Sequence, residues 1–140
     1  MNTTWPEALS LFESFARTRG LTLVERKEDA VAFGNKVVVM GNDRLYVRLV
    51  LDRGICGADV AEAAATPKKW YSVVILRDLL EGVGDDSLSL PEQINVLERN
   101  WETLMDSFSA GNRNNTYEKL VVVRNARGRR LFPKLYGDNT

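Results

Sequence analysis

The chain has 140 residues, the size of one globular domain, and 44% hydrophobic and 27% charged residues are enough for an ordinary hydrophobic core. It has no histidine and a single cysteine, which excludes a Ser-His-Asp triad, an intramolecular disulfide and a cysteine zinc site. Nineteen Lys and Arg residues balance nineteen Asp and Glu residues, so the zero net charge gives no overall attraction to nucleic acid or anionic lipid.

The first stretch, "MNTTWPEALS", lacks the basic and apolar regions of a secretory signal, and no later run reaches the ~18 apolar residues of a membrane span. We therefore expect a cytoplasmic protein. Thr4 and Glu7 have the spacing of a helix capping box. The apolar residues that follow repeat every three to four positions, which predicts a helix that ends at Gly20.

From Leu21 to about Ala61 the pattern changes to short β-branched and aromatic runs: "LTLVER", "AVAFGN", "KVVVMGN" and "RLYVRLVLDRG". Turn residues at 34–35 and 41–43 separate these runs and predict antiparallel neighbours. In the last run Leu45, Val47, Leu49 and Leu51 alternate with more polar residues, which predicts a sheet with one buried face. The next run, "ICGADVAEAAA", fits either a fifth strand or a loop.

The chain after the sheet carries signals for up to three helices. Thr66 and Pro67 fit the cap and first position of a helix closed by Gly82, with Lys68 and Lys69 in its first turn. Ser89 and Glu92 form a second capping box before a long apolar stripe that ends near residue 111. Residues 116–132 carry a valine run and remain open between helix and strand.

These elements predict an α+β fold in one domain over residues 1–140, in which residues 135–140 form a flexible tail. The predicted order is an N-terminal helix, an antiparallel sheet of four to five strands, and two to three C-terminal helices. The three tryptophans fall on apolar stripes, so they are expected in the core. The tryptophans expected there are Trp5, Trp70 and Trp101.

Two features near the end of the fourth run have both a structural and a functional interpretation. Asp52, Arg53 and Gly54 could form a turn or a binding pair at a strand end, and the turn is favoured because no second acid or histidine is nearby. Cys56 could be a nucleophile, but its apolar, strand-like surroundings favour core packing.

Charge is distributed unevenly along the second half of the chain. Residues 78–106 contain one base, Arg99, and eight acids: Asp78, Glu81, Asp85, Asp86, Glu92, Glu98, Glu102 and Asp106. Residues 113–134 contain one acid, Glu118, and seven bases: Arg113, Lys119, Arg124, Arg127, Arg129, Arg130 and Lys134. The two segments either neutralise each other within the fold or present an acidic surface to a cationic protein.

The "WPEALSLFESFARTRG" helix, the "AFGN" turn, the strand ending in "VRLVLDRG" and a later tryptophan helix resemble immunity proteins of bacterial polymorphic-toxin and contact-dependent growth inhibition systems. The resemblance covers roughly residues 5–80. In that family a strand commonly ends in Asp-Arg-Gly-Gln, which Asp52, Arg53 and Gly54 match, whereas Ile55 replaces the glutamine.

This resemblance implies a non-enzymatic cytoplasmic protein that blocks one cognate toxin domain, and such toxins are frequently nucleases. It implies no catalytic residue, metal or cofactor. The expected toxin-binding residues come from the charge pattern instead: Asp78, Glu81, Asp85, Asp86, Glu98, Glu102 and Asp106.

Two other functions remain as alternatives. A small enzyme could hold hydrated magnesium through Asp52, Asp59 or the Asp85–Asp86 pair. A regulatory RNA-binding module could use Arg127, Arg129 and Arg130, although that segment lacks interleaved aromatic residues.

Overall fold

The computed structural model describes residues 3–28, 34–82, 84 and 87–131 of the chain. Its elements follow the order helix α1 (Trp5–Thr18), strands β1 (Thr22–Glu28), β2 (Lys36–Gly41), β3 (Leu45–Asp52), β4 (Ile55–Glu62) and β5 (Tyr71–Ser72), and helices α2 (Val73–Glu81), α3 (Leu90–Ser107) and α4 (Arg113–Leu131). The α+β fold predicted from the sequence is confirmed, and "ICGADVAEAAA" contains a strand rather than a loop.

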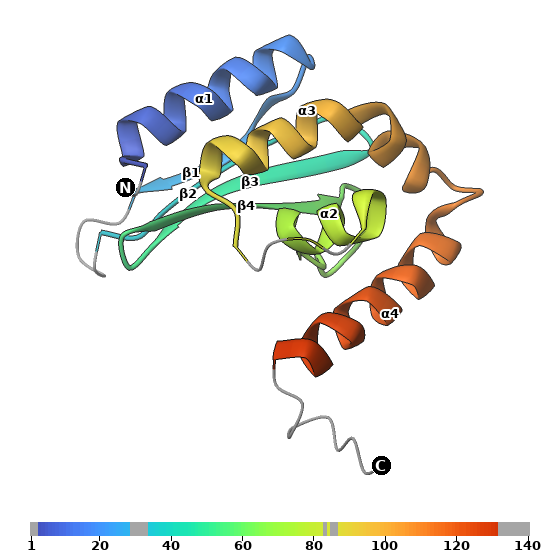
Figure 1. Ribbon diagram of the computed structural model, residues 1–140. Helices are drawn as coiled ribbons and strands as arrows, with labels where there is room; N and C mark the ends of the chain where they lie inside the picture. The colour runs from blue at the N-terminus through green and yellow to red at the C-terminus, as the bar shows by residue number, and fades with distance from the viewer. Residues whose placement is uncertain (1–2, 29–33, 83, 85–86, 132–140) are drawn as a thin grey trace.

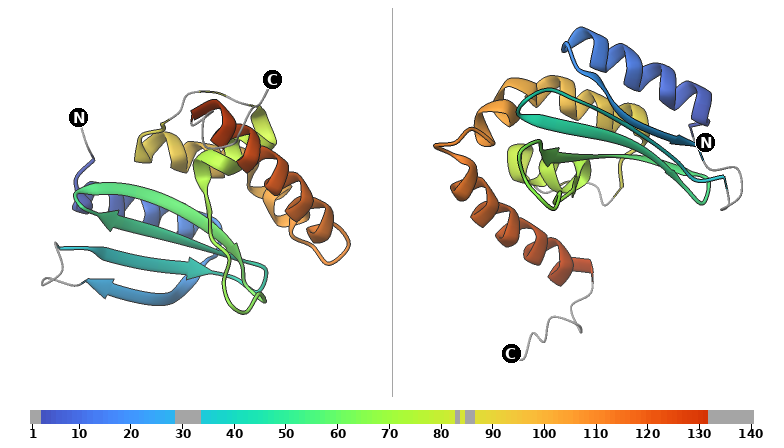
Figure 2. Two further views of the ribbon diagram at one scale, coloured as in Figure 1. Left: turned by 90° about the horizontal axis from the view of Figure 1, so that it is seen from below. Right: turned by 180° about the vertical axis from the view of Figure 1, so that it is seen from behind.

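The five strands form an antiparallel meander in the order β1-β2-β3-β4-β5. Helices α1 and α3 lie side by side over one face of this sheet, which we call the inner face (Figure 1). The opposite, outer face of β1 to β3 is not crossed by any described helix, as the view from below shows (Figure 2). The two faces of the sheet therefore have different environments.

One hydrophobic core lies between the inner face and the helices. Leu45, Val47 and Leu49 of β3 are fully buried there, as their alternation predicted. Phe15 of α1 meets Trp101 of α3 edge to face, with ring centroids 5.5 Å apart, and this contact joins the two helices above the sheet.

The caps predicted for two helices are present. The Thr4 hydroxyl accepts a hydrogen bond from the Glu7 N–H at 3.4 Å, which satisfies one of the free donors at the start of α1. At α3 the capping box is complete, because Ser89 accepts from the Glu92 N–H and Glu92 accepts from the Ser89 N–H. Local sequence signals were therefore sufficient to locate the starts of α1 and α3.

The segment between β4 and α2 differs from the prediction. Thr66 and Pro67 do not start a helix; the bond between them is a cis peptide, and α2 begins six residues later than predicted, at Val73 behind the Ser72 cap. The Lys68 ammonium donates to the carbonyl oxygens of Ala63 and Ala65 at 2.5 and 2.7 Å. This lysine closes a turn, so neither it nor Lys69 opposes a helix dipole.

The last described element is a helix, which resolves the choice left open for residues 116–132 as far as Leu131. The predicted tail at 135–140 and the predicted strand residues 30–33 lie outside the described residues, whereas Gly34 and Asn35 are in the expected connection. None of the described helices is both long enough and apolar enough to cross a membrane.

Candidate binding surfaces

The residues expected to form an acidic surface have three different environments. Asp78 is buried, with a side chain 0% exposed. It accepts from Arg77 at 2.9 Å and from Arg127 of α4 at 3.0 Å. The prediction of Asp78 as a toxin-binding residue is therefore wrong, because this carboxylate is enclosed and neutralised by two arginines.

Glu81 lies at the end of α2 and is engaged within the fold. Arg99 of α3 binds it through three hydrogen bonds of 3.0–3.2 Å, and Asn100 adds one of 2.6 Å. These donors, Arg99 first, lower the pKa of the Glu81 carboxyl. Glu81 joins α2 to α3 and is still exposed, so its predicted contact with a toxin stays a prediction. Asp85 and Asp86 lie outside the described residues.

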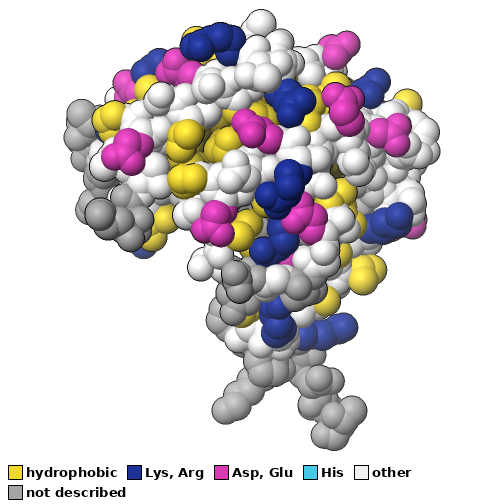
Figure 3. All heavy atoms as spheres, turned by 45° about the horizontal axis from the view of Figure 1, so that its top comes forward, with side chains coloured by type: hydrophobic (Ala, Val, Ile, Leu, Met, Phe, Trp, Pro, Cys, Tyr) yellow, Lys and Arg dark blue, Asp and Glu magenta, His cyan; other side chains and the backbone are white. Residues whose placement is uncertain are grey.

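Three of the predicted acids form one row on the solvent side of α3. Glu98, Glu102 and Asp106 are all exposed, and no hydrogen bond or ion pair of their carboxylates is found among the described residues. Their spacing of four places neighbouring carboxylates close together on the helix surface. We call these three residues the α3 acidic row. On this side of the molecule, acidic side chains lie among basic and apolar ones rather than in one continuous patch (Figure 3).

Helix α3 holds the acidic row on a rigid support. Its opposite side buries Ile94, Leu97, Trp101 and Leu104, each no more than 4% exposed. The Arg19 guanidinium, at the end of α1, also donates to the Glu98 carbonyl oxygen at 3.1 Å. A partner would therefore meet carboxylates whose backbone is already ordered, which reduces the entropy lost on binding.

The basic segment uses several arginines to attach α4 to the rest of the fold. Arg113 donates to buried Glu62 of β4 at 3.2 Å, and Arg127 donates to Asp78 of α2. The Arg124 guanidinium lies 4.9 Å from the ring centre of Tyr71. The acidic and basic segments thus neutralise each other at the Asp78–Arg127 contact. The carboxylates of the α3 acidic row take no part in this pairing.

The α4 attachment includes a buried polar pair that the sequence did not indicate. The Tyr117 hydroxyl donates to Glu62 at 2.7 Å. Burial, followed by this hydrogen bond, raises the pKa of Tyr117 above its usual range. Nothing in the local sequence marks Glu62 or Tyr117, because they are 55 residues apart.

Asp52, Arg53 and Gly54 form the hairpin between β3 and β4. Arg53 and Gly54 have φ angles of +52° and +83°, which is typical of a two-residue turn that matches strand twist. The Arg53 N–H donates to the Asn35 side chain at 3.1 Å, so this turn is tied to the connection before β2. This geometry agrees with the structural interpretation of the motif.

Cys56 lies partly buried beside that hairpin. Its thiol donates to the Thr3 carbonyl oxygen at 3.7 Å, and burial raises the pKa of the thiol. A raised pKa reduces the thiolate population, which is the opposite of what a nucleophile requires. The structure thus agrees with packing rather than catalysis for Cys56.

A cleft of about 420 Å³ adjoins β4 and brings together two aspartates that were candidate magnesium ligands. Asp52 and Asp59 both line it. However, Asp59 pairs with Arg48 at 2.7 Å, and among the described residues no three Asp, Glu or Cys side chains converge as a metal site would require. The structure therefore does not bring Asp52 and Asp59 together with a third acid, and the Asp85–Asp86 pair lies outside the described residues.

The outer face carries aromatic and basic side chains whose association the sequence did not reveal. Arg48 lies 4.4 Å from the ring centre of Trp70, and Lys68 lies 5.0 Å from that of Tyr46. Trp70 is half-buried on this face and is not part of the main core, which corrects its predicted place. Trp101 is buried as predicted, and Trp5 packs partly against the core.

Comparison with protein-family models, curated proteins and solved structures finds no match for this chain. The resemblance to immunity proteins thus stays a prediction, and the two surfaces described above are the basis for assigning a function.

Proposed function

We propose that this chain is a cytoplasmic immunity protein that binds a cognate cationic toxin domain and neutralises it by occluding its active site or substrate path. A nuclease is the favoured toxin class, since a protein that binds nucleic acid needs a basic cleft. The observation that carries the proposal is the α3 acidic row, which is exposed and whose carboxylates form no ion pair with the described residues.

The acidic row does not serve the stability of its own helix. Each like-charge pair spaced by four costs about 0.2–0.5 kcal/mol. Asp106 also lies in the last turn of α3, where the helix dipole disfavours negative charge and the turn itself carries no basic residue. A row that opposes helix stability is accounted for if a partner supplies the missing positive charge.

Charge complementarity of this kind acts mainly on the rate of association. Exposed carboxylates steer a basic partner toward the complex, and salt weakens this attraction over a screening length of about 8–10 Å. The proposal thus predicts a one-to-one complex whose association slows as salt is added.

The test co-expresses the chain with the C-terminal domain of the protein encoded immediately upstream of its gene, and purifies the two together. We expect the chain to rescue growth, and we expect Glu98→Lys, Glu102→Lys and Asp106→Lys together to weaken binding at least tenfold at 50 mM salt. The matched control compares Glu102→Lys with Glu118→Lys, the same charge change at an exposed position of α4.

Unchanged affinity in the triple variant, with its thermal unfolding intact, would remove the acidic row from the interface. Failure of the wild-type chain to bind or to rescue would refute the immunity function itself. The two results are separable because the first compares variants of a complex and the second asks whether the complex forms.

A further inference from the structure

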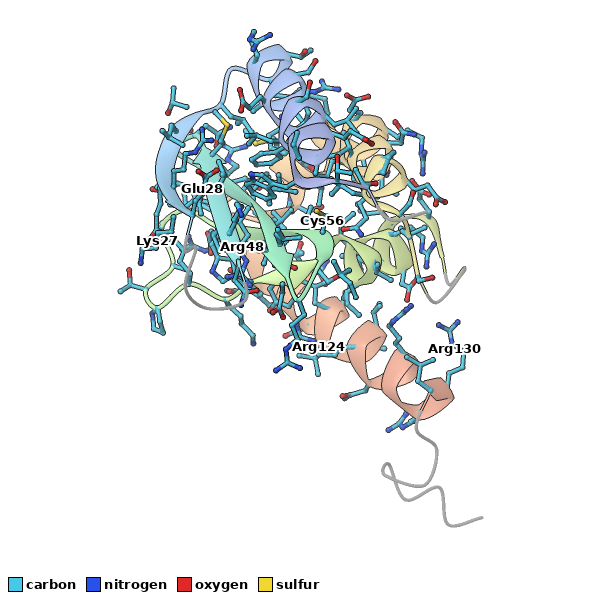
Figure 4. All side chains as sticks on the ribbon, turned by 90° about the vertical axis from the view of Figure 1, so that its left-hand side faces the viewer. Lys27, Glu28, Arg48, Cys56, Arg124 and Arg130 are labelled. Atoms are coloured by element: carbon cyan, nitrogen blue, oxygen red, sulfur yellow. The ribbon has the colours of Figure 1, made fainter. Side chains whose placement is uncertain are left out.

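Strand β1 is an edge of the sheet that no described strand pairs on its outer side. Its one neighbour in the strand order is β2, and all seven of its residues are exposed. Leu23 and Val24 are apolar, yet their exposed fractions are 58% and 45%. In Figure 4, Lys27 and Glu28 lie at one margin of the molecule, on the opposite side from Arg130. The backbone groups along this edge are therefore open to a further strand.

An apolar cleft of about 320 Å³ adjoins this edge on the inner face, between β1 and α1. Apolar side chains of β1, β2 and the turn before β1 form part of its lining: Leu21, Leu23, Val38 and Met40. Charged side chains form the rest: Glu13, Arg17 and Arg26. The exposed apolar surface at Leu23 thus continues from the strand edge into the cleft.

The hairpin after β2 determines which backbone groups of β1 point outward. The Asn42 N–H donates to the Leu45 carbonyl oxygen at 3.0 Å. Hydrogen bonding alternates along an antiparallel strand, so Val38, an even number of positions before Asn42, bonds to β3 and not to β1. Arg26 is opposite Val38, and its N–H and C=O therefore point away from β2, as do those of Glu28.

The charged side chains of this edge are divided between the two faces of the sheet. Arg26 lines the cleft on the inner face, so Glu25 and Lys27, its neighbours on either side, lie on the outer face. Glu25 pairs with Lys27 at 3.1 Å, and Arg26 pairs with Glu28 at 3.0 Å. The four charges of the edge are therefore balanced on each face.

A second copy of β1 complements this edge in one antiparallel register. With the two-fold axis at Arg26, each Glu25 is directly opposite the partner's Lys27 on the outer face. These pairs are of the type without hydrogen bonds between them, in which side chains lie closest. The two Arg26 side chains meet on the inner face, and each has its own Glu28 as counter-charge. An axis at Glu25 or at Lys27 would instead oppose like charges.

We propose that two copies of this chain associate through their β1 edges, antiparallel about Arg26, and join their sheets into one continuous sheet. Edge strands that avoid pairing also carry charges and bulges, and the β1–β2 register does shift between Leu23 and Glu25. The order of the charges favours pairing, because Glu25 and Lys27 are complementary to the same residues of a second copy. This association goes beyond toxin neutralisation and does not depend on it.

Sedimentation equilibrium of the purified chain at 5–500 μM tests the association directly. A single edge strand buries a small area, so we expect a reversible dimer with a dissociation constant of about 10–100 μM at 50 mM salt. Raising the salt to 300 mM should weaken the dimer about threefold, because the ion pairs that fix its register are exposed and screened.

Charge reversal tests the register. Glu25→Lys and Lys27→Glu each place like charges opposite each other, so each variant alone should dimerise about tenfold more weakly than the wild type. A mixture of the two variants has opposite charges at both positions and should form a heterodimer about as tight as the wild-type dimer. The matched control is Glu118→Lys, the same charge change at an exposed position of α4, which should leave dimerisation unchanged.

A second variant tests the backbone pairing at the two-fold axis. Arg26→Pro deletes an N–H that does not bond to β2, and an edge strand tolerates proline at such a position. Thermal unfolding of the monomer should therefore stay close to that of the wild type, whereas dimerisation should weaken at least tenfold. Arg26→Ala keeps the N–H and should retain the dimer.

Four results would overturn the proposal. The first is a chain that stays monomeric up to 500 μM at 50 mM salt, which would leave the edge to an extended segment of another protein. The second is a dimer that neither charge reversal weakens, and the third is a mixture of the two reversals that forms no heterodimer. The fourth is a dimer lost in Val122→Glu and retained in Glu25→Lys, which would assign the contact to the exposed side of α4.

Discussion

Helices α3 and α4 have similar lengths, 18 and 19 residues, and opposite charge, but they attach to the sheet in opposite ways. α3 buries a continuous apolar stripe and turns its acids to solvent. α4 buries only Thr116 and Leu120, pairs Arg113 and Arg127 with carboxylates of β4 and α2, and leaves Val122 68% exposed. A charged run in a sequence therefore does not by itself identify a surface, because arginines can serve as attachment points.

The strongest test of this difference is removal of the shared carboxylate under α4. Asp78→Ala removes the buried carboxylate that Arg77 and Arg127 share, whose own side chains are only 9% and 10% exposed, and should lower the free energy of unfolding by about 3–5 kcal/mol. Urea denaturation measures this loss, with Glu118→Ala as an exposed reference within about 0.5 kcal/mol of wild type. A loss below 1 kcal/mol for Asp78→Ala would mean that α4 is not held by this pair.

The apolar attachment of α3 predicts a similar loss from a different cause. Leu97→Ala empties a fully buried position and should cost about 2–5 kcal/mol. Val122→Ala, on the outside of α4, should change stability by less than about 0.5 kcal/mol. Thermal unfolding of both variants compares the helices directly, and equal effects would contradict the assignment of inner and outer sides.

A smaller effect of opposite sign is expected for the α3 acidic row. Replacing Glu98 and Glu102 by Gln and Asp106 by Asn removes like-charge neighbours, so the free energy of unfolding should rise by about 0.5 kcal/mol at low salt. Because the repulsion is screened, the gain should vanish in 1 M salt. A loss of stability at low salt would show that the row has a structural partner.

The smallest expected effect concerns pH and distinguishes Glu81 from the exposed row. The folded-state pKa of Glu81 is lowered by Arg99, so its contribution to stability is present above about pH 4.5 and is lost as the pH falls through the folded value. Glu81→Gln should flatten the acid limb of the stability curve. Glu98→Gln serves as the control and should leave that limb nearly unchanged.

The sequence predicted elements where local signals agree. Thr4, Ser89 and Glu92 locate the starts of α1 and α3, and the alternation in β3 identifies its buried side. The Thr66-Pro67 signal was misleading, because a turn closed by Lys68 follows it and Tyr71 pairs with Val60 of β4, so that the helix starts only at Val73. Helix start signals and turn signals share the same residue types, so a tertiary contact decides between them.

The surfaces were less predictable than the fold for a related reason. Glu98, Glu102 and Asp106 could be placed on one face of α3 from their spacing. Asp78 fits the same acidic run, but its burial depends on Arg127, 49 residues away. The Arg48–Trp70 contact could not be predicted either, since it joins β3 to the segment that follows β4.

The attachment of α4 through arginines has a consequence for how the molecule opens. Separating this helix from α2 exposes Leu120 and the ring contacts of Tyr117, but it leaves the contacts of α1 and α3 with the sheet in place, so α4 can detach while the sheet, α1 and α3 stay assembled. Deuterium uptake should then be fast along 113–131 and slow in β3 and α3. The chain would then have two parts of different local stability, a stable part formed by the sheet, α1 and α3 and a less stable C-terminal helix.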